Sequence, residues 1–226
     1  MKTTLAFDVY GTLINPQGVL LELQNLIGDQ ALAFSNLWRE KQLEYSFRKG
    51  LMESYQHFGI CTQQALDYCD AFFNTQLTDQ QKTALLSIYK VLPAFDDVIT
   101  GLSRLSKEQF AVYAFSNGLQ ESVENLLVHA KIDQYFDGVV SVDDLKTFKP
   151  NPKVYEYFLS QTQSTAENTW LISSNNFDVL GALNSGFNTV WVNRTKKQIL
   201  DPWGDQPTII ADDLSSLAEL ISGFKD

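Results

Sequence analysis

The residue best placed for chemistry is Asp8, which directly follows the short apolar run Leu5–Phe7 and precedes a turn at Gly11. The apolar run predicts a buried parallel strand. A carboxylate at the end of such a strand projects into the crevice where open parallel sheets bind ligands. An ionised carboxylate there can divide a difficult displacement into two steps through a covalent ester. Asp8 is therefore a candidate nucleophile.

Three more polar elements could meet Asp8. Ser116-Asn117-Gly118 and Ser173-Ser174-Asn175-Asn176-Phe177-Asp178 each follow an apolar run, and Lys149 lies in a loop before a helix. A lysine ammonium beside Asp8 would favour the ionised carboxylate that a nucleophile needs. Each element alone has a plainer interpretation, because Ser-Asn-Gly is more often a turn and helix cap, and a Lys-Pro is more often at the surface. Their order and their placement at strand ends favour one common site.

The elements that must position these residues alternate between strand and helix. Strands are predicted at Leu5–Phe7, Phe110–Phe115, Trp170–Ile172, Thr189–Val192 and, as a further strand, Thr208–Ile210. Helical spacing joins Phe95, Val98, Ile99, Leu102 and Leu105, and again Leu119, Val123, Leu126 and Leu127. This alternation predicts an α/β fold with a doubly wound, mainly parallel sheet, which is a Rossmann-like core.

Residues 16–91 break the alternation, because their apolar spacing predicts several helices and no strand. We expect an all-helical cap subdomain at 16–91, packed over the carboxyl edge of the sheet. The α/β catalytic core would then comprise 1–15 and 92–226. Leu92-Pro93 marks the return to the core, since proline disfavours helix in the preceding residue.

The charge, the apolar runs and the few cysteines and histidines of the chain argue against several classes of function. The formal net charge of -10 argues against nucleic acid or an anionic membrane as a partner. No apolar run is long enough to span a bilayer and no secretory segment opens the chain, so a cytoplasmic location is expected. Cys61 and Cys69 have no histidine cluster beside them, which favours two buried or half-buried thiols over a zinc site. His57 and His129 are isolated, which disfavours a Ser-His-Asp hydrolase.

In order and placement, the four polar elements resemble the sequential motifs of the haloacid dehalogenase superfamily over most of the core. Within the helical segment, Leu37-Trp38-Arg39-Glu40-Lys41-Gln42-Leu43-Glu44-Tyr45 closely resembles the cap helix of the L-2-haloacid dehalogenases (type II). The resemblance implies that Arg39 faces the cleft and receives a departing halide. An exposed helix arginine paired with an acid is the plainer interpretation of Arg39. The match of the surrounding sequence to the dehalogenase cap helix favours the interpretation of Arg39 as the residue that receives the halide.

Two acids of the superfamily's phosphatases have no counterpart here. Those phosphatases hold magnesium with three groups, which are the nucleophile, the backbone carbonyl two residues on, and an acid. The resemblance implies that Ser174 stands at the position of that acid in this chain. A second acid, which protonates an oxygen leaving group, is replaced by Tyr10. A halide leaves without a proton, and a haloacid has no phosphoryl charge to neutralise. Carbon–halogen cleavage therefore explains both the missing proton-donating acid and the missing magnesium-binding acid. We expect no metal and no cofactor.

The resemblance also implies roles for further residues. Thr12 and Ser116 would orient the nucleophile or the substrate, Ser173 and Asn175 would position Asp8, Lys149 or water, and Tyr155 would support the site. Asp178 would help to hold Lys149 and activate water, or would balance the local charge. Backbone amides around Asn117 suit the substrate carboxylate, because a helix N-terminus favours anions. An apolar wall would include Tyr10, Leu43, Phe58 and Phe177, each of which could equally be plain core.

The sequence departs from the family at Phe177 and Phe47, where tryptophan is common, and at Glu40, an acid beside Arg39. These changes bear on pocket size, halide preference or rate. Dimers are common among relatives, so a homodimer is compatible with the resemblance.

The expected function is metal-independent hydrolysis of short L-2-haloalkanoic acids to 2-hydroxy acids through an aspartyl ester at Asp8. One alternative is a magnesium-dependent phosphatase of the same superfamily acting on a small metabolite. Another is a catalytically silent scaffold that binds a partner. The combination of Asp8, Arg39 and Lys149 speaks against the scaffold, since no binding role requires all three.

Overall fold

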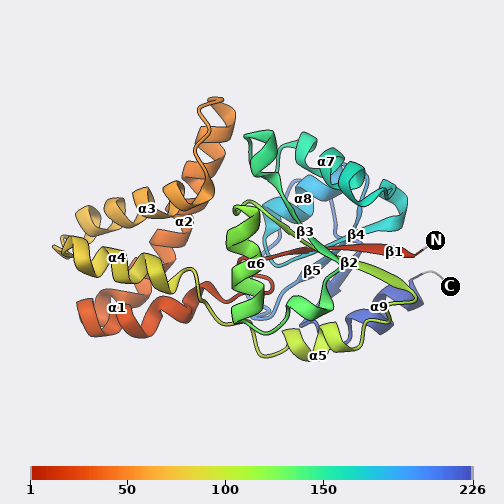
Figure 1. Cartoon of the computed structure of the whole chain (residues 1–226), viewed down its shortest axis with the longest axis horizontal. Coiled ribbons are helices and arrows are strands. Elements are labelled where there is room, and N and C mark those ends of the chain that lie inside the picture. Colours follow the sequence, from red (N-terminus) through yellow and green to blue (C-terminus); the bar gives the residue numbers. More distant parts are fainter. Residues whose placement is uncertain (1, 225–226) are drawn as a thin grey trace.

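A computed structural model describes residues 2–224 as a six-stranded sheet beside a group of helices (Figure 1). All neighbouring strands are parallel, in the order β3-β2-β1-β4-β5-β6. The strands are β1 (Thr3–Asp8), β2 (Phe110–Ser116), β3 (Gly138–Ser141), β4 (Thr169–Ser173), β5 (Asn188–Val192) and β6 (Ile209–Ala211). The chain therefore has the predicted doubly wound α/β fold.

The five predicted strands are confirmed, and the prediction missed one. β3 is an edge strand of four residues that begins with a glycine and has its first two residues only half-buried. Such a segment lacks the long apolar run of the central strands, which are buried on both faces. The central strand β1 is buried along its whole length.

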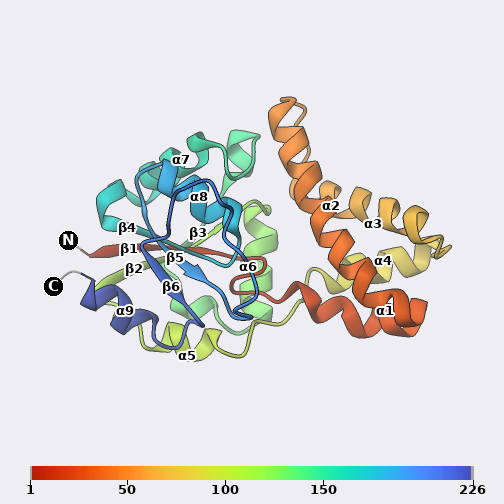
Figure 2. The same ribbon diagram turned by 180° about the vertical axis from the view of Figure 1, so that it is seen from behind.

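Helices cover both faces of the sheet. The helices α5 (Val98–Ser103), α6 (Gln120–His129) and α9 (Leu217–Gly223) share one buried cluster with Leu5 and Phe7. The helices α7 (Pro152–Thr162) and α8 (Asn176–Asn184) pack with Ala6 in a second cluster, on the opposite face (Figure 2). The helix predicted from Phe95 to Leu105 is shorter than expected, because both of these residues lie outside α5.

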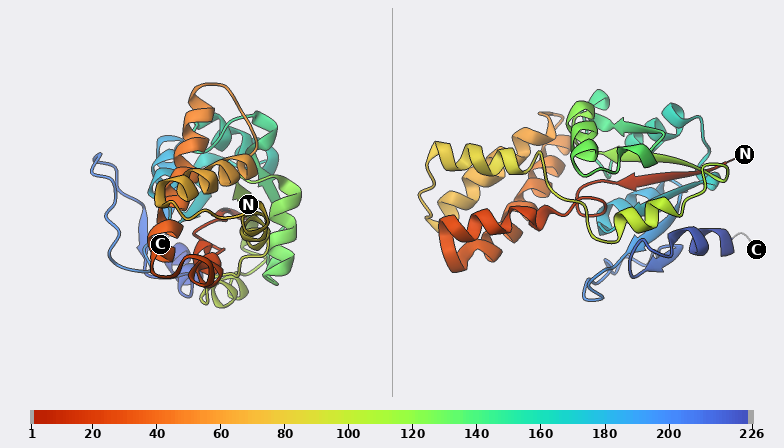
Figure 3. Two further views of the ribbon diagram at one scale, coloured as in Figure 1. Left: turned by 90° about the vertical axis from the view of Figure 1, so that its left-hand side faces the viewer. Right: turned by 60° about the horizontal axis from the view of Figure 1, so that its bottom comes forward.

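Residues 16–91 contain no strand and form a helical lobe beyond the end of β1 (Figure 3). Its main helices are α1 (Leu20–Ile27), α2 (Ala31–Leu51), α3 (Phe58–Phe73) and α4 (Asp79–Ile88). Fully buried Phe34 and Trp38 pack edge to face inside the lobe, and the indole nitrogen of Trp38 donates to the carbonyl of Thr62 at 2.8 Å. Helix α4 begins with a capping box between Thr78 and Gln81, which satisfies backbone donors at its start.

Two expectations from composition concern the cysteines and the membrane. Cys61 and Cys69 are buried free thiols on α3, as predicted. No helix within residues 2–224 is both long and apolar enough to cross a membrane.

Candidate active site

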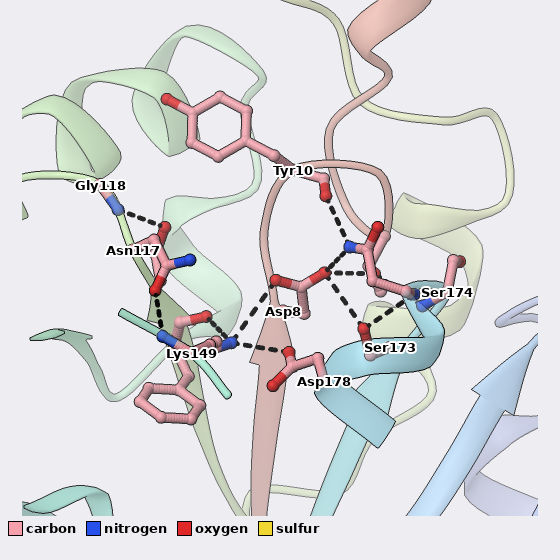
Figure 4. Close-up of polar contacts among 12 residues, drawn as sticks. Asp8, Tyr10, Asn117, Gly118, Lys149, Ser173, Ser174 and Asp178 are labelled. Atoms are coloured by element: carbon pink, nitrogen blue, oxygen red, sulfur yellow. Dashed lines mark hydrogen bonds and ion pairs between the residues drawn. The ribbon is translucent and has the colours of Figure 1, made fainter. Parts of the chain in front are cut away.

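Asp8 ends β1 with its carboxylate almost fully buried and its two oxygens in unlike surroundings (Figure 4). Oδ2 accepts hydrogen bonds from the hydroxyl of Thr12 at 2.8 Å, the hydroxyl of Ser173 at 3.2 Å and the amide nitrogen of Asn175 at 2.6 Å. Oδ1 meets only the ammonium of Lys149, at 3.5 Å, among the described residues. The three donors come from the turn after β1 and the end of β4, which are neighbours because β1 pairs with β4. One oxygen is thus held and the other is left more open.

Lys149 is 1 % exposed and lies between two carboxylates. Its ammonium donates to Asp178 Oδ2 and to the backbone carbonyl of Phe115, both at 2.8 Å, and lies 4.0 Å from the centre of the Phe115 ring. The backbone amide of Lys149 donates to Oδ1 of Asn117 at 2.9 Å, which ties the loop before α7 to the end of β2. The ammonium is therefore fixed from three sides beside Asp8.

Asp178, on the first turn of α8, is fully buried. Burial raises the pKa of Asp178 to about 6, and the nearby charge of Asp8 adds to the rise while Lys149 opposes it. The phenol of Tyr155 donates to Asp178 Oδ1 at 2.8 Å. The pKa of Tyr155 itself is raised, first by burial and then by Asp178, so its phenol stays a hydrogen-bond donor.

A magnesium ion does not fit the donors around Asp8. The amide nitrogen of Asn175 donates both to Asp8 Oδ2 and to the backbone carbonyl of Tyr10, at 2.6 and 3.0 Å. Both neighbours are acceptors, so a nitrogen must face them. The resemblance implies that these are the two groups that hold the ion in the phosphatases of the haloacid dehalogenase superfamily. At the third position the hydroxyl of Ser174 accepts a hydrogen bond from Arg194 at 3.2 Å, and residues 2–224 contain no cluster of metal-binding side chains.

The segment after β2 is organised by hydrogen bonds that do not involve the Asp8 side chain. The hydroxyl of Ser116 accepts a hydrogen bond from the backbone amide of Gly118 at 3.1 Å, and no side-chain hydrogen bond joins Ser116 to Asp8 in the described chain. The carbonyl of Gly118 accepts from the hydroxyl of Ser141 at 2.6 Å, which fixes this turn against β3. Helix α6 starts directly afterwards with Leu119 as its N-cap, and this residue offers no side-chain acceptor to the first-turn amides. Free amides at a helix start suit a carboxylate ligand.

Arg39 reaches the site from α2. Its guanidinium donates to the backbone carbonyl of Tyr10 at 3.1 Å and to Oε1 of Gln42 at 2.7 Å. Burial lowers the pKa of Arg39, while the phenols of Tyr89 and Tyr10 and the Asp8 carboxylate act in the opposite direction. Glu40, the next residue, is exposed to solvent. The plainer interpretation, an arginine on the surface paired with an acid, does not describe this side chain.

The predicted apolar wall lies around Arg39 and the loop after β1. The ring centroids of Tyr10 and Phe58 lie 6.0 Å apart, and Phe58 packs in turn on Phe148. Phe148 belongs to the part of the chain outside residues 16–91, which contains the sheet and which we call the sheet lobe. Burial raises the pKa of Tyr10 to about 12, so this phenol stays neutral at ordinary pH. Leu43 is half-buried on α2, one turn beyond Arg39.

Two of the departures from the family pattern meet each other. The ring of Phe47, on α2, packs edge to face on the ring of Phe177, on α8, with centroids 5.0 Å apart. The pair therefore joins the helical lobe to the first turn of α8, which directly follows Ser173 and Asn175.

Reasoning from sequence missed an arginine behind the site. Arg194 follows β5 and donates to the carbonyl of Thr12 at 2.8 Å and to Ser174, so it joins the two segments that hold Asp8. Its guanidinium is fixed by two hydrogen bonds to Asp97, at 3.0 and 2.9 Å, and lies 4.2 Å from the ring of Phe95. Its place just after a strand was the signal in the sequence, since the other site segments have the same placement.

Comparisons with known proteins agree with this geometry. The family model described as haloacid dehalogenase-like hydrolase matches residues 5–192. The chain is 35% identical to (S)-2-haloacid dehalogenase 4A of Burkholderia cepacia over 188 residues, which are 83% of this chain and 81% of that protein. It is 34% identical to (S)-2-haloacid dehalogenase 1 of Pseudomonas sp. (strain CBS-3) over 214 residues, or 95% and 92% of the two chains.

A solved structure is similar over nearly the whole length. The L-2-haloacid dehalogenase from Xanthobacter autotrophicus with chloropropionic acid covalently bound superposes with a TM-score of 0.92. The two chains are 26% identical, and the match covers 99% of each.

Proposed function

The chain belongs to the haloacid dehalogenase-like hydrolases, and we propose that it acts as an (S)-2-haloacid dehalogenase, a hydrolase of carbon–halide bonds. It converts short L-2-haloalkanoic acids to 2-hydroxy acids through an aspartyl ester. The observation that carries this proposal is the inequality of the two oxygens of Asp8, three donors on Oδ2 against one long contact on Oδ1.

In the first step Oδ1 of Asp8 attacks C2 of the substrate from the side opposite the halogen. The C–O bond forms as the carbon–halogen bond breaks, and configuration at C2 inverts. Oδ1 is the better nucleophile because the hydrogen bonds that stabilise the negative charge are concentrated on Oδ2. The substrate carboxylate would lie at the uncapped start of α6.

The leaving halide carries the electron pair of the broken bond and would lie against Arg39. A halide needs a cation or N–H donors and no proton. The lack of a carboxylic acid at position 10 is therefore no obstacle to this chemistry, whereas an alkoxide leaving group would need such an acid, and the phenol of Tyr10, with its pKa raised to about 12, is a much weaker one.

In the second step water attacks the ester carbonyl carbon, which is Cγ of Asp8. Negative charge then develops on Oδ2, where Thr12, Ser173 and Asn175 already donate. Preorganised donors aimed at a developing oxyanion are among the largest contributions to catalysis. Collapse of the intermediate releases the 2-hydroxy acid and restores Asp8.

Lys149 and Asp178 serve both steps. Lys149 balances the charge of Asp8 before attack, and ionised Asp178 holds Lys149 and takes the proton of the attacking water. Ser116, Asn117 and Tyr155 act through the groups they fix: the turn before α6, the Lys149 loop and Asp178.

We further propose that residues 16–91 work as a cap on a catalytic core of 1–15 and 92–226. Support comes from contacts between the lobes, which include Arg39 with the Tyr10 carbonyl and the ring pair of Phe47 and Phe177. A cytoplasmic location is also proposed from the composition of the chain, and a homodimer is proposed because dimers are common among relatives. Cell fractionation and sedimentation analysis test these two proposals.

The direct test is halide release from L-2-chloropropionate, with and without EDTA. We expect chloride release that EDTA leaves unchanged, that the D-isomer does not support, and that Asp8→Asn abolishes. Release of phosphate from p-nitrophenyl phosphate that EDTA abolishes would instead support the phosphatase. No halide release from any short haloacid would overturn the proposal.

A further inference from the structure

Arg39 has a neighbour on its own helix that carries no assigned role. Gln42 is fully buried, one turn further along α2, and its Oε1 accepts the Arg39 guanidinium at 2.7 Å. A glutamine with no exposure is uncommon unless its amide is fully satisfied. Both ends of this amide are engaged, because Nε2 donates to the hydroxyl of Thr62 on α3 at 2.5 Å.

The direction of this chain of hydrogen bonds is fixed at its far end. The hydroxyl of Thr62 has a single proton and donates it to the carbonyl of Phe58 at 3.1 Å. Its oxygen must therefore accept from Gln42, which requires that the nitrogen of the Gln42 amide faces Thr62. The carbonyl oxygen of the same amide is then turned towards Arg39. A flipped amide would place N–H groups against the guanidinium and leave both without an acceptor.

The consequence for Arg39 is a fixed orientation. One terminal nitrogen donates to Gln42 and the other to the carbonyl of Tyr10, so two edges of a planar group are held. The remaining N–H groups of the guanidinium then have a set direction in which to meet a leaving halide. An arginine free to rotate would lose rotamer entropy each time a halide bound.

The surroundings support a positioning role over plain packing. Thr62 is 5 % exposed, and its carbonyl accepts the buried indole of Trp38, which precedes Arg39. Its hydroxyl contacts the carbonyl of Phe58, whose ring lies on Tyr10. Helix α3 is thus tied to α2 on both sides of Arg39 by hydrogen bonds that an apolar interface would not need.

We infer that Gln42 and Thr62 are positioning residues that orient Arg39 for the departing halide. This inference rests on the proposed function, because it assigns Arg39 the leaving group. The pair sets the halide affinity of the site and how strongly the rate depends on the leaving halogen.

The test compares Thr62→Val with Thr62→Ser. Valine keeps the volume and removes the hydroxyl, whereas serine keeps the hydroxyl and removes a methyl group. Bromide binding is measured from the broadening of the bromide NMR signal, with Arg39→Met to identify the site. We expect bromide affinity to fall by up to about tenfold in Thr62→Val, the upper end for one hydrogen bond between neutral groups, and by about twofold at most in Thr62→Ser.

Turnover supplies a second measurement. In Thr62→Val the ratio of kcat for the 2-bromo over the 2-chloro substrate should rise severalfold, because chloride is the poorer leaving group and needs Arg39 more. Gln42→Met, which has a similar size and replaces the amide with a thioether that is only a weak acceptor, should change both quantities in the same direction and further than Thr62→Val. Equal losses in Thr62→Val and Thr62→Ser, or an unchanged halide ratio, would overturn the inference.

The binding measurement separates this inference from the proposed function. A wild-type protein that binds bromide through Arg39 but releases no halide from haloacids would refute the function, and weaker bromide binding in Thr62→Val than in Thr62→Ser would still support the orientation of Arg39 by Gln42 and Thr62. A wild-type protein that shows no bromide binding would refute the inference even where haloacids are hydrolysed.

Discussion

The sheet side of the site and the helical side hold their key residues to different degrees. On the sheet side, Asp8 and Lys149 are almost completely buried. Asp8, at the end of β1, accepts a hydrogen bond from β4, and Lys149 donates hydrogen bonds to β2 and α8. On the helical side, Arg39 is half-buried and is held by Gln42 of its own lobe and by the carbonyl of Tyr10 across the boundary. We call Asp8, Lys149 and the groups that hold them the sheet wall, and we call Arg39 and Gln42 the cap wall.

The difference follows from what each wall must do. The sheet wall stabilises charge that appears at one atom, Oδ2, so fixed donors are an advantage. The cap wall must let substrate enter and halide leave, so its bonds to the sheet lobe have to be few. Substitutions in the sheet wall should therefore act on the chemical steps, and substitutions at the lobe boundary should act on binding.

The largest effect is expected from Lys149→Met. It leaves Asp178 buried without its cation, which should lower the free energy of unfolding by about 3–5 kcal/mol. Activity should fall at least about 10³-fold, since the loss includes a preorganised charge at the reacting carboxylate. The double variant Lys149→Met/Asp178→Asn should recover stability in urea unfolding but not activity. Recovery of both would remove Lys149 from the mechanism.

Next in size is Asn175→Ala, which removes one donor from Oδ2. Loss of one donor to an oxyanion lowers kcat by about 10²–10³-fold. Because the second step depends on Oδ2 more than the first, the aspartyl ester should accumulate and appear as added mass on the intact protein. Asn176→Ala, at the neighbouring position whose amide donates to the carbonyl of Ile199, is the matched control and should be near wild type. An active Asn175→Ala enzyme without ester would contradict the role of Oδ2.

The pH dependence should follow Asp178. Its pKa is raised to about 6, so kcat/KM should fall about tenfold per pH unit below that value as the carboxylate is protonated. Any stability that the raised pKa contributes has the opposite dependence, because it is present at low pH and is lost as pH rises through 6. Tyr155→Phe removes a donor that favours the ionised form and should move the acid limb to higher pH. An unmoved limb would mean that another group controls it.

The smallest effect is expected at the lobe boundary. Tyr55, after α2, donates to Asp143 of the sheet lobe at 2.5 Å, and Tyr55→Phe removes this bond. One such bond contributes about 1 kcal/mol, so KM should rise about fivefold at most while kcat stays within about twofold. Tyr157→Phe is the control, because Tyr157 donates to the adjacent Asp144 within the sheet lobe. A large fall in kcat for Tyr55→Phe would mean that the boundary contact shapes the chemical step.

The sequence was most informative where local pattern decides the structure. Central strands such as β1 have continuous apolar runs, and their polar ends marked Asp8, Ser116 and Ser173 as neighbours, because parallel strands end at one edge. Edge strand β3 was missed because half of its four residues face partly outward.

The contacts that pair residues across the fold could not be predicted in the same way. Gln42 looks like an ordinary helix glutamine until α3 brings Thr62 against it. Arg194 is one arginine among the cations after β5 until Asp97 and Thr12 fix it. The choice of Oδ1 over Oδ2 as nucleophile likewise depends on hydrogen bonds that join the turn after β1 with the end of β4.

The covalent role of Asp8 is tested most directly by a single turnover in ¹⁸O-labelled water with enzyme in excess over substrate. Attack of water on Cγ places the label in the carboxylate, so the 2-hydroxy acid should be unlabelled and the peptide that contains Asp8 should gain one ¹⁸O. Label in the product and none in that peptide would show direct attack of water on C2, and would contradict an ester intermediate at Asp8.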